Sequence, residues 1–287
     1  MNFYNETSLA CSKLITNAYS TSFSMGIKAF DKALHEPIYA IYGFVRYADE
    51  IVDTFHDFDK ATLLEEFTKE TWLAIERGIS LNPILNSFQW VVNKYDVPNE
   101  LIETFLNSME MDLEEKTYDT ENYEKYILGS AEVVGLMCLK VFVEGNDTEY
   151  ERLKPSAMKL GSAFQKINFL RDLQADYNEL GRAYFPGFDI NTFDDATKKE
   201  IEKDISLDFS LGYEGVKQLP KKARLGVYLA YVYYFKLFNK IKNIFTGKLL
   251  CSTEVLSFPQ TKLKLFIFLP KIFRRPETEF NEFERRF

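Results

Sequence analysis

Cysteine and histidine are scarce in this chain of 287 residues, which contains three cysteines and two histidines. Cys11, Cys138 and Cys251 lie too far apart to suggest a disulfide framework or a metal site, so a reducing compartment is expected. With only His35 and His56 available, the composition also disfavours zinc chemistry and histidine-based catalytic triads.

Positive charge is in deficit as well, since 35 Lys and Arg face 43 Asp and Glu and leave a formal net charge of −8. A nucleic-acid partner is not expected, because nucleic-acid binding needs a basic surface. The N-terminal stretch MNFYNETSLACSKL does not indicate a signal peptide, and no run of about 18 apolar residues predicts a membrane span. We expect a cytoplasmic protein, or one bound peripherally to the inner face of the membrane.

Aromatic residues are abundant, with 26 Phe and 17 Tyr in an aromatic share of 16%. Two explanations stay open: a core built from bulky side chains, or a cavity that holds an apolar ligand. Hydrophobic residues make up 46% of the chain, which is enough for a sizeable core in either case.

Helical periodicity dominates, and no convincing alternating strand interrupts it, so we predict an all-α protein with a single domain over residues 1–287. The turn signals SLNP, VPNE and EGND separate the helical segments. The predicted helices cover about 33–56, 60–77, 98–116, 121–144, 150–178, 196–218 and 222–247.

The C-terminal tail, from about residue 262, interleaves basic and apolar residues in TKLKLFIFLPKIFRRPETEF. Such a segment could rest on an anionic membrane surface, with its apolar side at the headgroups. It could equally be a final helix packed on the domain, followed by a frayed end. Both interpretations stay open.

The stretch FVRYADEIVDTF, residues 44–55, carries charges in an otherwise apolar helical segment. Each helical residue advances by about 100°, so Tyr42, Arg46, Asp49 and Asp53 share a stripe about 60° wide. Glu50 lies beside that stripe. Because burying unpaired carboxylates is costly, a compensating partner is expected for these acids.

A second stretch, GSAFQKINFLRDLQADY, residues 161–177, repeats the pattern with Gln165, Asn168, Asp172 and Asp176 on one stripe. If the two helices face each other across a cavity, their carboxylates repel unless cations lie between them. Oxygen ligands without His or Cys favour Mg²⁺ or Mn²⁺, completed by water and phosphate oxygens. The implied ligand is a diphosphate with an apolar tail.

Four motifs in order, YSTSFSMGIKAF, AIYGFVRYADEIVD, YILGSAEVVG and FQKINFLRDLQADYNELGRAYFP, resemble the squalene and phytoene synthase family. The resemblance runs from about residue 12 to about 250 and is greatest to bacterial phytoene synthases. It implies an isoprenoid-synthase-type helical bundle around a central apolar cavity. It also implies Mg²⁺-dependent, head-to-head condensation of two geranylgeranyl diphosphates to phytoene through a cyclopropylcarbinyl (prephytoene) diphosphate, as in carotenoid biosynthesis, with no nicotinamide.

The resemblance also implies roles for individual residues. The metal ligands are Asp49, Asp53, Asn168, Asp172 and Asp176. Tyr42 and Arg46 join the four aspartates as catalytic residues. The substrate-binding residues are Ser20, Ser22, Phe23, Arg46, Gln165, Asn168, Arg171, Arg182, Tyr184 and Tyr234. Leu128 and Glu132 depart from the family's usual residues, which leaves the local pocket contacts open.

Two other functions stay in view. One is a dehydrosqualene or squalene synthase, which would use farnesyl diphosphate on the same site. The other is a non-catalytic assembly protein that retains the fold, although the presence of all four aspartates favours an enzyme. The expected partners are prenyl diphosphate substrates and, in a carotenoid pathway, the enzymes that act next.

Overall fold

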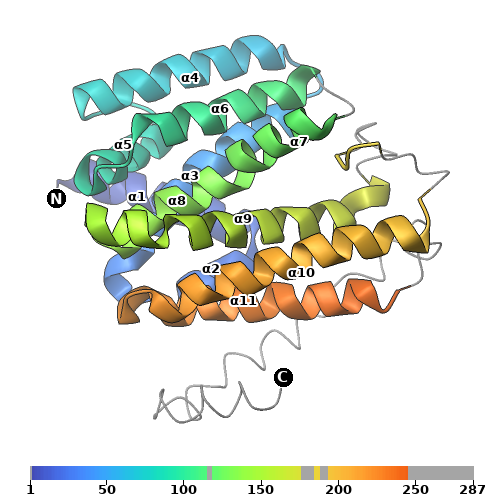
Figure 1. The fold of residues 1–287 in the computed structure, drawn as a ribbon. Helices are drawn as coiled ribbons and strands as arrows, with labels where there is room; N and C mark the ends of the chain where they lie inside the picture. The colour runs from blue at the N-terminus through green and yellow to red at the C-terminus, as the bar shows by residue number, and fades with distance from the viewer. Residues whose placement is uncertain (1, 115–117, 176–183, 188–192, 245–287) are drawn as a thin grey trace. The chain divides into compact units, whose positions relative to one another are not determined.

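The computed structural model describes residues 2–114, 118–175, 184–187 and 193–244. Every regular element in these ranges is helical, which confirms the all-α class (Figure 1). The helices are α1 Phe3–Tyr19, α2 Thr21–Ile27, α3 Lys32–Thr54, α4 Lys60–Arg77, α5 Pro83–Tyr95, α6 Asn99–Glu114, α7 Thr120–Ile127, the π-helical turn η1 Leu128–Glu132, α8 Val133–Phe142, α9 Asp147–Ala175, α10 Asp195–Gln218 and α11 Lys221–Lys242.

All of these helices belong to one compact unit, Met1–Thr253. A second unit, Glu254–Phe287, lies outside the described residues, as does the tail from about residue 262 with its predicted membrane contact. Among the helices that the structure describes, none is both long enough and apolar enough to cross a bilayer. The single-domain assignment and the central cavity stay predictions.

The helix predicted over 121–144 is confirmed to within two residues, but it contains a π-helical turn, because α7, η1 and α8 follow one another without a gap. A π-helical turn takes up one more residue than an α-turn, and here it lies where the chain approaches α6 closely. A Cβ atom added to Gly129 would lie 2.5 Å from Ser108 Cβ and 2.7 Å from the Thr104 carbonyl oxygen. Glycine at this position permits a contact that any side chain would prevent.

Three helices were absent from the sequence prediction: α1, α2 and α5. The α5 segment carried a readable signal, since SLNP contains both its cap and its first residue. The side chain of Asn82 accepts a hydrogen bond from the Ile84 amide at 3.0 Å, and Pro83 occupies the first helical position. Proline there sacrifices no helical hydrogen bond, so the motif starts a helix rather than marking a loop.

Phenylalanine rings fill the centre of the core around α3. Phe44 is fully buried, and its ring stacks on Phe88 of α5 with centroids 3.8 Å apart. Phe67 of α4 and Phe105 of α6 contact the same ring, at 5.5 Å and 5.4 Å. Burying a ring of this size contributes about 1.5–3 kcal/mol. At this position the bulky-core explanation of the aromatic composition is correct.

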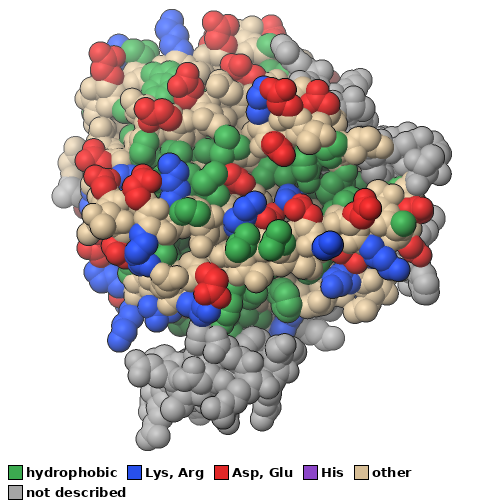
Figure 2. All heavy atoms as spheres, in the orientation of Figure 1, with side chains coloured by type: hydrophobic (Ala, Val, Ile, Leu, Met, Phe, Trp, Pro, Cys, Tyr) green, Lys and Arg blue, Asp and Glu red, His purple; other side chains and the backbone are tan. Residues whose placement is uncertain are grey.

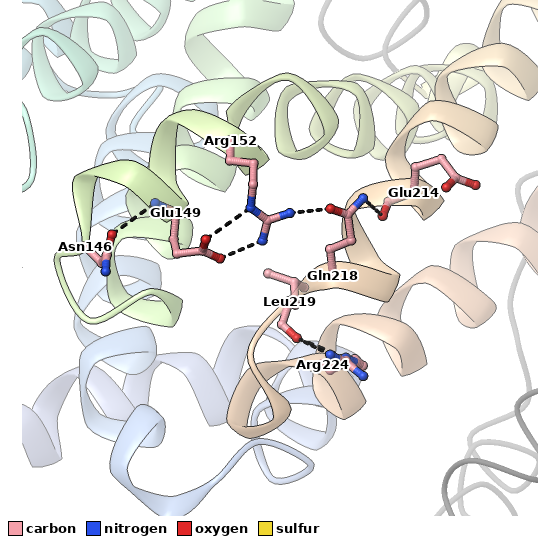
Figure 3. A network of polar contacts seen from close by, with 7 residues as sticks. All are labelled: Asn146, Glu149, Arg152, Glu214, Gln218, Leu219 and Arg224. Carbon is pink, nitrogen blue, oxygen red and sulfur yellow. Dashed lines mark hydrogen bonds and ion pairs between the residues drawn. The ribbon is translucent and has the colours of Figure 1, made fainter.

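The 29-residue helix α9 packs against α8, α10 and α11 (Figure 1). Figure 3 shows how its first turns are joined to α10: Arg152 binds Glu149 through two nitrogens and also donates to the side-chain oxygen of Gln218. Arg224 of α11 donates to the Leu219 carbonyl oxygen at 2.8 and 3.0 Å, which closes the turn between α10 and α11. These contacts hold three long helices together at one end.

Candidate functional site

The first acidic stripe lies on α3, where the predicted helical spacing is confirmed. Asp49 is half-buried, and its pKa is raised from 3.8 to about 7. Burial is the largest cause, the negative charge of Asp53 is the next, and Arg46 acts in the opposite direction. Because the Asp49 carboxyl group is poorly solvated and has other carboxylates nearby, a cation would bind there favourably.

Asp112 of α6 adds to this negative charge and was missed in the sequence analysis. It is 8% exposed, and it accepts a hydrogen bond from the Tyr126 hydroxyl at 2.7 Å and from the Tyr118 hydroxyl at 3.4 Å. Its charge contributes to the raised pKa of Asp49. The available signal was its place on the buried side of α6, at helical spacing from Phe105.

Arg46 supplies the positive charge beside the stripe. It forms an ion pair with Glu50, and its guanidinium lies over the Tyr19 ring, 4.6 Å from the centroid. Burial acts to lower the pKa of Arg46, but the bond to Glu50 and the charge of Asp49 outweigh it, and the pKa is raised. The buried Nε atom has no hydrogen-bond partner in the described part of the chain. An anionic oxygen would satisfy it.

Ser20 and α2 lie against this stretch of α3. The Ser20 hydroxyl accepts a hydrogen bond from the Phe23 amide at 3.1 Å and also bonds to the side chain of Tyr42. The Phe23 ring stacks on the Tyr42 ring with centroids 4.6 Å apart, and burial raises the pKa of Tyr42. The structure therefore brings together Ser20 and Phe23, which the family resemblance assigned to substrate binding, and Tyr42, which it assigned to catalysis.

The second stripe lies on α9 and forms a chain of hydrogen bonds. Tyr234 of α11 donates to Asn168 Oδ1 at 3.3 Å, and Asn168 Nδ2 donates to Gln165 Oε1 at 3.2 Å. Gln165 Nε2 in turn donates to Ser130 Oγ of η1 at 3.2 Å. The Tyr234 ring also stacks on Phe164, with centroids 4.1 Å apart. The polar side of α9 is thereby held between α11 and η1.

Asp172 follows on the same stripe and is paired with its neighbour in the chain. Arg171 Nε lies 2.7 Å from Asp172 Oδ1, and a terminal nitrogen binds Oδ2 at 2.5 Å. Burial acts to lower the pKa of Arg171, but Asp172 outweighs it and the pKa is raised. The predicted site residues Asp176 and Arg182 lie outside the described residues, and so does the side chain of Ser22.

A cluster of aromatic rings lies between α9 and the buried Asp112 of α6. The buried Tyr184 stacks on Phe169 of α9 at 4.2 Å and contacts Tyr126 of α7 at 5.2 Å. Tyr126 donates to Asp112, whose charge acts on Asp49 of α3. The predicted substrate residue Tyr184 therefore belongs to the group that links the second motif helix to the first acidic stripe.

The carboxylates around Asp49 suit a divalent cation that takes few of its ligands from the protein. Within 2–114, 118–175, 184–187 and 193–244, no three acidic, His or Cys side chains lie close enough together to hold a metal ion. Mg²⁺ does not require such a cluster, because it usually binds one or two carboxylates and completes its shell with water and substrate phosphates. The half-buried Asp49 beside Asp53 and Asp112 fits that pattern.

A family model described as squalene/phytoene synthase matches residues 16–208. The chain belongs to this family. Among its relatives, the 4,4′-diapophytoene synthase of Staphylococcus haemolyticus is 26% identical over 199 residues, 66% of this chain and 66% of that protein. The phytoene synthase of Pseudescherichia vulneris is 30% identical over 177 residues, 58% of this chain and 56% of that protein. The chain thus spans less than two thirds of the length of either relative.

The squalene/phytoene synthase fold is also found in a solved structure. A dehydrosqualene synthase determined in complex with a ligand superposes with a TM-score of 0.78 at 20% identity, covering 93% of this chain and 97% of that one. This match confirms the isoprenoid-synthase-type fold that the motifs implied.

Leu128 and Glu132, the two departures from the family's usual residues, bound the π-helical turn η1. Leu128 is partly buried against the core. Glu132 is directed to the other helix that carries a family motif, since it accepts a hydrogen bond from Ser162 of α9. Burial raises the pKa of Glu132, while the bond to Ser162 opposes this change.

Proposed function

We propose that this protein is a Mg²⁺-dependent prenyltransferase that condenses two prenyl diphosphates head to head. The observation that carries the proposal is the arrangement of charge along α3. Asp49 has a pKa raised by burial and by neighbouring carboxylates, while Arg46 has a buried Nε without a partner in the described residues. An excess of negative charge beside a free donor suits a magnesium diphosphate, which presents both a cation and anionic oxygens.

The proposed metal ligands are Asp49 and Asp53 on α3 with Asn168, Asp172 and Asp176. Magnesium held there would supply Lewis-acid chemistry by drawing charge from the departing diphosphate oxygen. Asp172, now paired with Arg171, would turn toward the incoming ion, and the released guanidinium would bind a diphosphate oxygen.

The chain's own groups would hold the diphosphates and exclude water. Arg46 and Tyr42 would donate to one diphosphate, while Tyr234 and the amides of Gln165 and Asn168 would serve the α9 side. Tyr184 and Arg182 are assigned to the same group by the family pattern. The α2 segment, with Ser20, Ser22 and Phe23, would cover the site, because a carbocation that meets water is captured by it.

The reaction itself needs few protein groups. Breaking the C–O bond of one substrate leaves an allylic cation, and the double bond of the second substrate attacks it. Loss of a proton closes a cyclopropylcarbinyl diphosphate. A second ionisation and rearrangement, followed by loss of another proton, gives a coupled product with a central double bond, and no nicotinamide is consumed.

The substrate we propose is geranylgeranyl diphosphate, which gives phytoene for carotenoid biosynthesis. Relatives of similar identity carry different product names, phytoene synthase and 4,4′-diapophytoene synthase, so condensation of farnesyl diphosphate is the second candidate. Proposed cofactors are Mg²⁺ or Mn²⁺ alone.

Purified protein incubated with each diphosphate and Mg²⁺, with and without a reduced nicotinamide, separates these functions. We expect the C20 substrate to give a C40 hydrocarbon in the absence of nicotinamide. Addition of a chelator that removes Mg²⁺ should stop the reaction. A C30 product alone would contradict the phytoene assignment. No product from either substrate would leave a non-catalytic assembly protein as the better explanation.

A further inference from the structure

A buried ionic cluster joins α9 to α10 on a different side of α9 from the predicted site residues Gln165, Asn168 and Asp172. Lys166 Nζ lies 2.6 Å from Asp208 Oδ2 and 2.5 Å from Asp204 Oδ2. Lys159 Nζ lies 3.1 Å from the other oxygen of Asp208, a residue only 1% exposed. Figure 2 shows acidic and basic side chains close together along the band where α9 and α10 run.

The spacing of Lys159 and Lys166 makes the cluster sensitive to movement of α9 relative to α10. Lys159 and Lys166 are seven residues apart, so they lie within about 20° of each other around α9 and about 10 Å apart along it. Both converge on the single carboxylate of Asp208. A slide or a rotation of α9 against α10 must therefore break at least one of these ion pairs.

Close packing reinforces this register one turn away. A Cβ atom added to Gly212 of α10 would lie 3.0 Å from the Leu160 Cβ, and one added to Gly215 would lie 2.5 Å from the Ser156 Cβ. The two helices touch there with almost no space between them. The ionic cluster lies on the side of these contacts nearer to the second motif.

The predicted site residues of α9 face away from Lys166. Counting about 100° per residue, Gln165, Asn168 and Asp172 are rotated by about 100–160° from Lys166. The rotation that Lys166 and Asp208 impose on one side of α9 therefore determines the direction of the carboxylate and amides on the other side.

Glu132 belongs to the same cluster through η1. It accepts a hydrogen bond from Ser162 of α9, and the charges of Lys159, Asp208 and Lys166 act on its carboxyl group. The departure from the family's usual residue at Glu132 is thus matched by polar partners on α9. The cluster holds three elements, η1, α9 and α10, in one arrangement.

Stability alone is a weak reason for this cluster. Burial acts to lower the pKa of Lys166, and the hydrogen bonds to Asp204 and Asp208 outweigh it and raise the pKa, so the lysine stays charged. Moving such charges out of water offsets much of their attraction, and an apolar side chain of similar volume often stabilises a protein as well or better. The best-attested use of buried ion pairs is to specify register.

We propose that Lys166, held by Asp204 and Asp208, is a positioning residue that sets the rotation and register of α9 and so directs Gln165, Asn168 and Asp172 toward a magnesium diphosphate. This inference rests on the proposed function. Outer partners that orient metal ligands change metal affinity by roughly 10- to 100-fold when they are removed.

The test compares Lys166→Met with Lys198→Met in the full-length chain. Lys198 and Glu202 form a similarly buried pair, 2.7 Å apart on α10, so breaking that pair is a matched control for lost stability. Thermal unfolding is measured against Mg²⁺ concentration at fixed inorganic pyrophosphate, and turnover is measured at saturating substrate. Lys166→Met should need about tenfold more Mg²⁺ for the same rise in melting temperature, and its kcat should fall by about 100-fold. Lys198→Met should keep the wild-type Mg²⁺ dependence.

Two further variants keep the test decisive. Lys166→Arg retains the charge and should recover most of the Mg²⁺ response. Asp204→Asn removes the more exposed of the two carboxylates that bind Lys166, so this variant tests positioning even where Lys166→Met fails to fold. It should also raise the Mg²⁺ concentration needed for the same rise in melting temperature. A wild-type Mg²⁺ response in folded Lys166→Met, or in Asp204→Asn where Lys166→Met does not fold, would overturn the positioning role alone. If magnesium pyrophosphate does not raise the melting temperature of the wild-type chain, the proposed function is refuted instead.

Discussion

Acidification should weaken magnesium binding because protons compete with the metal for Asp49. Burial and the charges of Asp53 and Asp112 raise the pKa of Asp49 from 3.8 to about 7. A carboxyl group must lose its proton before it binds a metal ion. With a pKa near 7, Asp49 is ionised in about nine molecules of ten at about pH 8 and in about one of ten at about pH 6. The apparent Mg²⁺ affinity should therefore fall about tenfold across this interval.

Titration calorimetry with Mg²⁺ alone measures this directly, because pyrophosphate would take up protons itself. Repeating the titration in two buffers of different ionisation enthalpy gives the number of protons released per Mg²⁺ bound. With a pKa near 7 for Asp49, this number should approach about one near pH 6 and fall toward zero near pH 8. Asp112→Asn removes one of the charges that raise the pKa of Asp49, so it should move the midpoint to lower pH. Asp147→Asn, at the exposed start of α9, is the control. Proton release that stays at zero throughout, or an unmoved midpoint in Asp112→Asn, would refute the reasoning.

The same shift affects the metal-free protein with a definite sign. Because the pKa of Asp49 is higher in the folded chain, the folded state binds more protons than the unfolded state between about pH 4 and pH 7. This contribution to stability is complete below about pH 4 and is lost as the pH rises through 7. The difference between 3.8 and about 7 corresponds to at most about 4 kcal/mol. Saturating Mg²⁺ should remove the dependence.

Three substitutions test other parts of the structure. Gly129→Ala should cost about 1–3 kcal/mol in urea unfolding, because its Cβ would collide with Ser108 and the Thr104 carbonyl; an unchanged midpoint would contradict the close contact between η1 and α6. Phe44→Ala removes a fully buried ring that stacks on Phe88 and should cost about 3–5 kcal/mol by the same measurement, with a loss below about 1 kcal/mol arguing against that core. Asp172→Asn should abolish turnover while circular dichroism and the melting temperature stay close to wild type, and near-normal turnover would rule out its proposed role as a metal ligand.

Helical periodicity predicted most of the described fold, because amphipathic stripes report which side of a helix is buried. The ranges 60–77 and 196–218 agree with α4 and α10 to within a residue. The helix α5 was missed because SLNP, which contains its cap Asn82 and its first residue Pro83, was interpreted as a turn between helices. The π-helical turn η1 lies where Gly129 approaches α6 closely, a tertiary contact that a local pattern does not contain.

The candidate site was predictable to the extent that its residues share a helix. Spacing alone assigned Tyr42, Arg46 and Asp49 to one stripe, and the structure adds the bond from Ser20 and the unpartnered Arg46 Nε. Asp112 was missed because it lies among other acids, Glu110, Glu114 and Glu115, and only its helical spacing from buried apolar residues marks it as buried. Its tyrosine partners come from other segments, and only folding brings them together.

The π-helical turn η1 changes the direction in which side chains before and after it point. On an uninterrupted α-helix, Tyr126 and Met137 would point within about 20° of each other, since they are eleven residues apart. The additional residue in Leu128–Glu132 turns the second half by about 100° relative to the first. Tyr126 can thus donate to Asp112 while Met137 is buried in the core. The additional residue of the π-helical turn changes which side of the helix faces each neighbour.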